Sequence, residues 1–394
     1  MDRLNRAGAD RRRLRRSSSL AGVGDGLVAV ALPLLAAGST RHPLAVASVV
    51  AAEHLPWAVL ATVRRAGRGA ADQRTVLGVG TTMRAAAVVV VGLLALVGAE
   101  TIVLLVMAAL VVGGGAALAD QAEEEVAGLL DQGSVGTERL GADLRRRAMI
   151  GMAVVGLPLG GLIYEVVAAL PFLVDVGVYA VAALTALTVR GPLVGPVSPV
   201  PVDGGRLTVS VPALAPGTGV VTLAAGGAMA ASSAVLGVLV LFALEDLGLG
   251  APAFGFLLAG LAAAATIGAL LAPTAGAVVG LRLGTAAALV VSGTAYAAAG
   301  VLADPAAPYL SALALGGGVG AGMVATVLLR AWLHARVGRV VDGDALAAFH
   351  ARVWAGVPLG ALAGGMAASA VGVADTVLGA GLLVILSAVP AGKK

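Results

Sequence analysis

Four ionisable residues of this sequence lie inside long apolar runs, where a charged group is costly. These residues are Asp25, Glu53, His54 and Arg84. By insertion scales, an ionisable side chain in the middle of a membrane-spanning helix costs about 2.5–3.5 kcal/mol, so it is treated as functional until it is shown to be structural. The chemistry open to such a set is reversible proton binding, because a low dielectric favours the neutral acid whereas a neighbouring Arg favours the carboxylate.

The two acids and the arginine are expected at similar depths in a membrane. At a rise of 1.5 Å per residue, Asp25 and Arg84 each lie about 12 Å into their helices from one side, and Glu53 lies about 14 Å in from the other. We therefore predict that Asp25 and Glu53 bind protons or substrate and that Arg84 is their counter-ion. The alternatives are a purely structural Asp25–Arg84 ion pair, a Glu53 that partners Arg84 or faces a water-filled cavity, and an Arg84 that contacts an anionic substrate.

Three ionisable residues are weaker candidates than Asp25, Glu53 and Arg84. His54 follows Glu53 directly, so it lies about 100° further round the helix. Helix packing explains His54 better than a proton relay does, although it stays in the predicted site. Glu165 and Asp175 are expected at the outer ends of their helices, where a polar head can reach the interface at little cost.

The elements that must hold these residues are membrane helices. The chain is 59% hydrophobic and 12% charged, whereas soluble domains are about 25% charged. A bilayer core about 30 Å thick needs about 20 apolar residues per helix. A long apolar run in lipid must also satisfy its own backbone, as a helix does. The expected spans are 17–38, 44–63, 76–98, 101–119, 148–169, 172–189, 218–242, 253–275, 284–302, 309–329, 345–371 and 376–392.

The positions of the basic residues indicate the orientation of these spans. Nearly all of the 26 Lys and Arg residues fall in segments that share one face of the membrane if the N-terminus is inside. Short cytoplasmic loops of helical membrane proteins carry an excess of Lys and Arg. We therefore expect a multi-pass protein of the cell membrane with both termini in the cytoplasm.

The chain divides into two halves that share a motif. Gly156-Leu-Pro158-Leu-Gly160 in the fifth span recurs as Gly356-Val-Pro358-Leu-Gly360 in the eleventh, and the Gly triplets 113–115 and 316–318 fall in spans four and ten. We predict an all-α membrane protein with twelve transmembrane helices as two six-helix pseudo-repeats around a central cavity. The predicted domains are a basic cytoplasmic N-terminus (1–16), a first bundle (17–189), a Pro-rich cytoplasmic connector (190–217), a second bundle (218–392) and a cytoplasmic tail (393–394).

The small residues of the fifth span are predicted to serve packing and gating. Glycines allow helix backbones to approach closely, and Pro produces a bend. The residues assigned to this role are Gly156, Pro158, Gly160 and Gly161.

The pattern resembles the major facilitator superfamily, and in particular its drug and siderophore exporters of the enterobactin-exporter-like branch. The residues that carry the resemblance are Gly24-Asp25-Gly26, Pro43-Leu-Ala-Val, Arg84, Pro171-Phe-Leu-Val-Asp175 and the Gly and Pro residues of 156–161, which resemble the antiporter signature of helix five. The resemblance covers nearly the whole chain. It implies alternating access by two six-helix halves and efflux in exchange for an ion.

The sequence departs from this family in the loop between helices two and three. The acid that the family normally carries there is replaced by Gly69, and the Arg that many members have in helix four is absent. One hypothesis is that the inner gate keeps the pairing with its signs exchanged, so that basic residues of the loop meet acids that end helix four. The residues of this hypothesis are Arg64, Arg65, Arg68, Glu123, Glu124 and Glu125. The alternative is a solvated helix end.

The sequence therefore predicts a secondary active transporter. We expect proton-coupled export of an amphiphilic or cationic small molecule such as a drug, siderophore or secondary metabolite. There is no Walker loop for ATP, the four His are scattered, and Cys is absent, so no metal site or cofactor is expected. We expect no enzyme activity, no nucleic-acid partner and a monomer in the lipid bilayer. The alternatives are a non-transporting membrane sensor or partner subunit on the same scaffold, and uptake instead of export.

Overall fold

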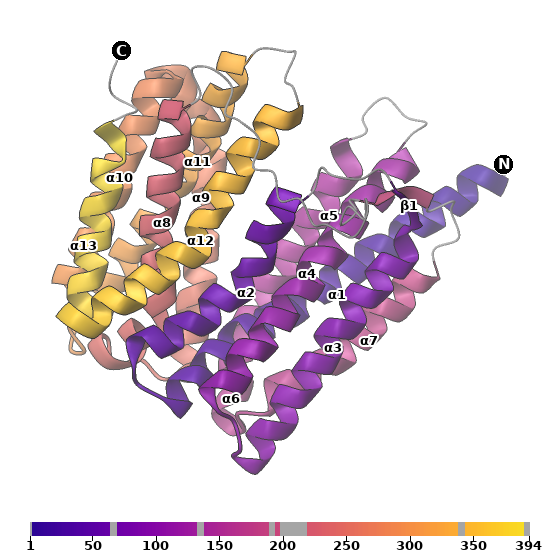
Figure 1. The fold of residues 1–394 in the computed structure, drawn as a ribbon, viewed down its shortest axis with the longest axis horizontal. Helices are drawn as coiled ribbons and strands as arrows, with labels where there is room; N and C mark the ends of the chain where they lie inside the picture. The colour runs from indigo at the N-terminus through magenta and orange to yellow at the C-terminus, as the bar shows by residue number, and fades with distance from the viewer. Residues whose placement is uncertain are drawn as a thin grey trace, which may run out of the picture. The chain divides into compact units, whose positions relative to one another are not determined.

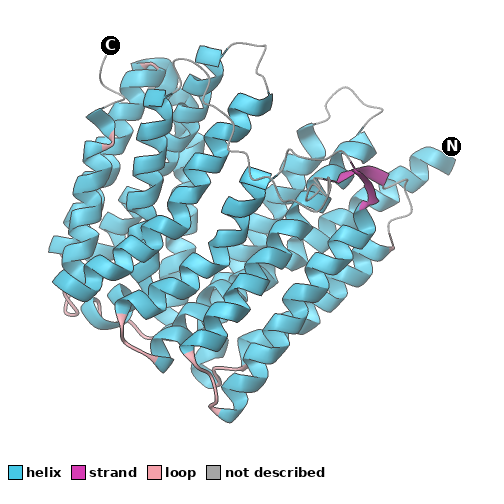
Figure 2. Cartoon of the chain, viewed as in Figure 1, coloured by secondary structure: helices cyan, strands magenta, loops and turns pink. Residues whose placement is uncertain are grey.

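The computed structural model describes residues 2–63, 69–131, 138–188, 194–197, 219–337 and 343–389. Within these ranges the chain is helical except for one short two-stranded ribbon (Figure 1, Figure 2). Ten of the described helices are long and apolar enough to cross a membrane, and two shorter apolar helices, α7 and α13, complete the set of twelve. The all-α membrane fold predicted from the sequence is confirmed.

The first half of the chain contains six helical rods. The fifth rod is continuous, because α5 passes through the π-helical segment η1 into α6. The elements are α1 (Asp2–Ser39), α2 (Pro43–Val63), α3 (Gln73–Val97), α4 (Ile102–Asp131), α5 (Glu138–Ile150), η1 (Gly151–Gly156), α6 (Leu157–Val166) and α7 (Leu170–Leu187).

The second half repeats this order of six rods. Its first rod ends in a π-helical turn, η2. The elements are α8 (Gly219–Leu241), η2 (Phe242–Asp246), α9 (Ala251–Val279), α10 (Leu281–Val301), α11 (Pro308–Val337), α12 (Gly343–Val371) and α13 (Val373–Leu386).

Two helices begin earlier than the sequence predicted. Helix α1 starts at Asp2, so residues 2–16 of the predicted basic N-terminus are helical and continue into the first span. Helix α5 starts at Glu138, ten residues before the expected span at 148. Its extra turns are held by Leu140 and Leu144, which are four residues apart and bury themselves in a cluster with Leu14 and Val126. A hydropathy average does not identify these turns as helix, because the charged residues on their outer face outweigh the two leucines.

The same helix neighbours occur in both halves. Helix α3 contacts α4 and α7, just as α10 contacts α11 and α13. Helix α1 packs on η1 and α6, just as α8 packs on α12. These matching relations agree with the predicted pair of six-helix pseudo-repeats.

The repeated Gly-Pro-Gly motif lies at equivalent contacts. A methyl group added at Gly156 would lie 2.8 Å from the Cα of Gly26, and one added at Gly360 would lie 2.8 Å from the Cα of Ala230. Both distances are too short for a real Cβ, so the helices pack backbone against backbone. The π-helical segment η1 runs directly into this motif, and Pro158 lies in the first turn of α6.

Two compact units emerge from the contacts. The first comprises residues 1–35 and 63–209, and the second comprises 36–62 and 210–394. Helix α2 thus belongs with the second unit, where Val50 and Ala51 pack on Ala361 of α12. The predicted domain boundaries 17–189 and 218–392 remain predictions.

The ribbon connects the loop after α2 to the segment after α7. Strand β1 (Gly69–Asp72) pairs antiparallel with β2 (Val194–Val197), with Asp72 opposite Val194. Asp72 also caps α3, because its carboxylate accepts a hydrogen bond of 3.0 Å from the backbone N–H of Arg74. Part of the predicted connector therefore forms a strand, outside the apolar runs.

Candidate functional site

A buried polar cluster forms where α1, α3 and α7 meet in the first unit. It consists of Asp25, Arg84, Asp175 and Tyr179, and we call it the Asp25–Arg84 cluster. An Nη2 hydrogen of Arg84 and the hydroxyl of Tyr179 are both donated to Oδ1 of Asp25. The guanidinium carbon of Arg84 also lies 4.4 Å from the centre of the Tyr179 ring, which is a cation–π arrangement.

The two charged partners of this cluster differ in their access to the surface. The side chain of Arg84 is 7% exposed, whereas that of Asp25 is 33% exposed. A buried guanidinium needs an opposite charge and hydrogen-bond acceptors, and Asp25 provides both. The predicted counter-ion role of Arg84 therefore has a matching geometry. Asp25 keeps enough exposure for a proton or cation to reach it.

Small residues on three helices make room for this cluster. Gly80 of α3 and Gly115 of α4 face each other, and a methyl group added at Gly115 would lie 2.6 Å from Cγ of Arg84. On α1, a methyl group at Gly24 would overlap the carboxylate of Asp175. The glycines next to Asp25 therefore allow a second acid to approach it.

Asp175 is buried among the packed helices, so the prediction that its head group reaches the outer interface was wrong. The residue is fully buried, and neither of its carboxylate oxygens has a hydrogen-bond partner among the described residues. It belongs to a buried stripe on α7 that also holds Phe172, Tyr179 and Ala182. The 3-4-3 spacing of this stripe is the sequence signal that could have identified Asp175 and Tyr179, because residues so spaced share one helix face.

Glu53 and His54 lie on α2, which belongs to the second unit. Glu53 is half-buried and makes no ion pair with the described residues. His54 is also half-buried, and its Nδ1 lies 2.9 Å from the carbonyl oxygen of Val50, one turn earlier in the same helix. This local contact fits the packing role, and the proton-binding role of Glu53 stays a prediction.

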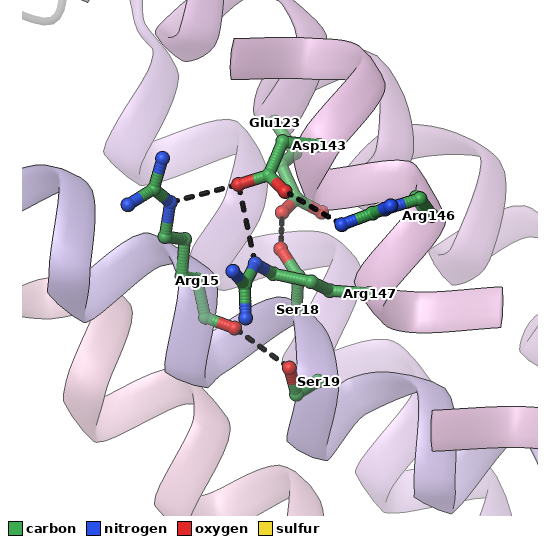
Figure 3. A network of polar contacts seen from close by, with 7 residues as sticks. All are labelled: Arg15, Ser18, Ser19, Glu123, Asp143, Arg146 and Arg147. Carbon is green, nitrogen blue, oxygen red and sulfur yellow. Dashed lines mark hydrogen bonds and ion pairs between the residues drawn. The ribbon is translucent and has the colours of Figure 1, made fainter. Parts of the chain in front are cut away.

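A second polar network joins the arginine-rich ends of α1 and α5 to the acidic end of α4 (Figure 3). Asp143 of α5 is its centre. One carboxylate oxygen accepts from Nε of Arg15 at 2.8 Å and from Nε of Arg147 at 3.1 Å, and the other lies 3.9 Å from Arg146. The hydroxyl of Ser18 on α1 donates to the carboxylate of Glu123 on α4. These contacts, which we call the end network, link α1 to α5 and α1 to α4.

Two of the acids at the end of α4 contact neighbouring helices: Glu123 accepts a hydrogen bond from α1, and Glu124 pairs with α5. Glu124 forms an ion pair of 2.5 Å with Arg145, and Glu125 is half-buried without an ion pair among the described residues. The predicted partners Arg64, Arg65 and Arg68 lie outside the described residues, so the exchanged-sign gate remains a hypothesis.

The arrangement offers no obvious metal centre. Within the described ranges, no group of three or more His, Asp or Glu side chains is placed to hold a metal ion. The chemistry that the Asp25–Arg84 cluster can perform is the exchange of a proton or a cation at a carboxylate whose charge is balanced by a fixed guanidinium.

Comparison with known proteins identifies the fold. No family model matches this chain, and no curated protein sequence matches it either. Among solved structures, a variant of the nucleoside transporter NupG matches with a TM-score of 0.73 and 11% identity over 96% of this chain and 98% of that one. A bacterial homologue of the iron transporter ferroportin, in its inward-facing state, matches with a TM-score of 0.73 and 14% identity over 98% and 99%.

These solved structures have the fold that the sequence resemblance implied. Both are transporters of the major facilitator fold and neither is an enzyme. At this level of identity the likeness concerns the fold, and the narrower resemblance to drug and siderophore exporters stays a prediction.

Proposed function

We propose that this chain is a secondary active transporter that exports an amphiphilic or cationic small molecule in exchange for protons. The observation that carries the proposal is the Asp25–Arg84 cluster, an ion pair within an apolar helical unit. Ion-coupled transport through such a fold needs a charged group that stays ionised inside the helical bundle and that the transported solute can reach.

The partial exposure of Asp25 supports its role as the solute contact. Arg84 is held by Asp25 and by the ring of Tyr179, so it is a fixed charge. Asp25 is one-third exposed, so a cationic group of the solute can reach its carboxylate. Glu53 on α2 is the corresponding candidate in the second unit. Motion of the two halves would expose the site alternately to each side.

The proposed setting is the cell membrane, with both termini in the cytoplasm and one chain as the working unit. The basic residues at the ends of α1 and α5 support this orientation. The end network lies among those residues, and we propose that it is part of the cytoplasmic gate, with Gly156, Pro158, Gly160 and Gly161 as the pliable contact of the fifth rod.

The proposal can be tested in energised inside-out vesicles that contain the protein. A pH-sensitive dye would report loss of the proton gradient while cationic and amphiphilic compounds are added. Nucleosides and iron ions belong in the panel because the solved neighbours are named for them. The variants are Asp25→Asn and Glu53→Gln, and Glu165→Gln is the matched control because Glu165 is exposed at the end of α6.

We expect at least one compound to release the gradient in the parent protein and in the Glu165 variant, and the Asp25 variant to abolish that release. A response that survives in both the Asp25 and Glu53 variants would keep a transporter but remove these residues from its site. No response to any compound, from folded protein, would count against transport.

The competing function is a non-transporting sensor or partner subunit on the same scaffold. It is favoured by Gly69, which stands where the resemblance leads us to expect an acid and which begins β1. The same vesicle assay separates the two, because a sensor would bind a compound without releasing protons.

A further inference from the structure

Asp175 is the buried acid that the proposed solute contact leaves unexplained. Its side chain is fully buried on α7, and both carboxylate oxygens lack hydrogen-bond partners among the described residues. An ionised carboxylate in such a place would lose its hydration without compensation, and buried groups in this situation take their neutral form instead.

The neighbours of Asp175 come from each helix packed against it. Helix α1 presents Gly24, where an added methyl group would overlap the Asp175 carboxylate, and Asp25 beside it. Helix α3 presents Arg84, and α7 itself presents Tyr179 one turn on. Asp120 of α4 interacts electrostatically with Asp25 and Arg84.

The charges of this site do not balance if every acid is ionised. Arg84 supplies one positive charge, and its guanidinium donates to Asp25 rather than to Asp175. Tyr179 also donates its hydroxyl to Asp25. With Asp25 as the carboxylate and Asp175 as the neutral acid, the charges of Arg84 and Asp25 cancel, and both Nη2 of Arg84 and the hydroxyl of Tyr179 have an acceptor in Asp25. The described contacts therefore place the carboxylate at Asp25 and the bound proton at Asp175.

We propose that Asp175 carries the proton that this protein exchanges, while Asp25 and Arg84 form the fixed pair beside it. This inference rests on the proposed transport function. Loss of the proton from Asp175 adds one negative charge next to Asp25, and the site then attracts a cationic group. Return of the proton removes that charge and releases the cation. Proton and cation thus compete for one acid, which is the requirement for obligatory exchange.

Gly24 explains how the second acid reaches the first. Any side chain at this position of α1 would occupy the place of the Asp175 carboxylate. The short Gly24-Asp25 sequence thus provides both the fixed carboxylate and the space for its partner on α7.

The first test needs no transport. Infrared spectra of the purified protein in nanodiscs would be recorded across a pH titration, because a protonated carboxyl group and a carboxylate absorb at different frequencies. We expect a protonated-carboxyl band at neutral pH that is weakened in Asp175→Asn and retained in Glu165→Gln. An unchanged band in Asp175→Asn would overturn the proposal.

A second measurement uses the parent protein alone, in case the variant fails to fold. Dicyclohexylcarbodiimide is an apolar reagent that reacts with protonated carboxylic acids, and mass spectrometry locates its adducts. We expect an adduct on Asp175 and none on Asp25. An adduct on Asp25 with Asp175 unmodified would contradict the assignment.

Transport then tests the coupling role. With a compound identified in the vesicle assay, we expect Asp175→Asn, which fixes the neutral form of the site, to lose both accumulation driven by a pH gradient and exchange of labelled for unlabelled compound. Asp25→Asn should lose both activities as well, since it removes the partner of Arg84. Proton-driven accumulation that persists in Asp175→Asn would overturn the proposal.

Failure of the parent protein to transport any compound would count against the proposed function, whereas the infrared and labelling results would still decide where the proton is bound.

Discussion

Arg84 depends on a single carboxylate for its charge balance. Its side chain is 7% exposed, and Asp25 is the acid that its guanidinium contacts. Breaking a buried ion pair from one side costs more than removing both partners, because the remaining charge stays in a low dielectric. The partly exposed Asp25 can recover some hydration after such a loss, whereas Arg84 cannot.

This asymmetry gives a prediction for a double-mutant cycle. We expect Asp25→Asn to destabilise the purified protein by about 3 kcal/mol, because it leaves a buried guanidinium without its partner. Arg84→Gln should cost less, since Asp25 can turn to solvent. The combined variant should be more stable than the sum of the single effects implies. Thermal unfolding in detergent measures all four proteins, and additive effects would show that the pair contributes nothing.

Among the helices, the repeated Gly-Pro-Gly motif makes equivalent contacts in both halves. Gly156 packs on α1 and Gly360 packs on α8, in each case against backbone atoms that cannot move aside as a flexible side chain can. Overpacking a tight contact costs about 1–3 kcal/mol.

We therefore expect Gly156→Ala and Gly360→Ala each to destabilise the protein by about 1–3 kcal/mol. Gly177→Ala on α7 and Gly379→Ala on α13 are matched controls, because a methyl group at either would meet nothing within 4 Å. These controls should be neutral or slightly stabilising, since Ala is the better helix former. Thermal unfolding of the four variants provides the comparison, and equal effects at contact and control positions would remove the packing explanation.

The end network leads to a different experiment on the helices α4 and α5. Glu124 and Arg145 are 45% and 64% exposed, so their ion pair is worth at most about 1 kcal/mol. A conformational bias of that size would still alter transport. We expect Glu124→Lys and Arg145→Glu each to reduce exchange activity through like-charge contacts, and the double charge swap to restore it.

Glu125→Lys is the informative control for this swap, because Glu125 makes no ion pair with the described residues. If it reduced exchange as strongly as Glu124→Lys, the partners of these acids would be the loop arginines of the exchanged-sign hypothesis, and the role of Arg145 would be contradicted.

For the whole molecule, hydropathy predicted most of the fold because lipid leaves the backbone few choices. Apolar runs of about 20 residues must become helices, and the helix order follows directly. The early turns of α5 were missed because Leu140 and Leu144 form an apolar stripe on an otherwise basic segment. The grouping of α2 with the second unit was missed as well, since hydropathy does not say which helices pack together.

The site was only partly predictable for a related reason. Asp25 and Arg84 stand out because they interrupt apolar runs. Asp175 was placed by its distance from the predicted helix end, and that measure ignores which face of α7 it occupies. The face follows from Phe172, Tyr179 and Ala182, and its partners follow only from the packing of α1 and α3.

The charge of the Asp25–Arg84 cluster leads to a prediction for the membrane as a whole. If one proton leaves Asp175 for each singly charged cation that binds, the loaded and protonated forms carry the same charge, and exchange moves no net charge across the membrane. Moving one uncompensated charge across the membrane would gain about 2.3 kcal/mol per 100 mV, which corresponds to roughly a 50-fold change in accumulation.

We therefore expect a potassium diffusion potential, set with valinomycin in proteoliposomes, to leave the accumulation of a singly charged cation unchanged while a pH gradient drives it. A doubly charged cation is the internal control, because its exchange for one proton would respond to the potential. A strong effect of the potential on the singly charged compound would show that more than one proton, or none, accompanies each cation, and one-for-one competition at Asp175 would be wrong.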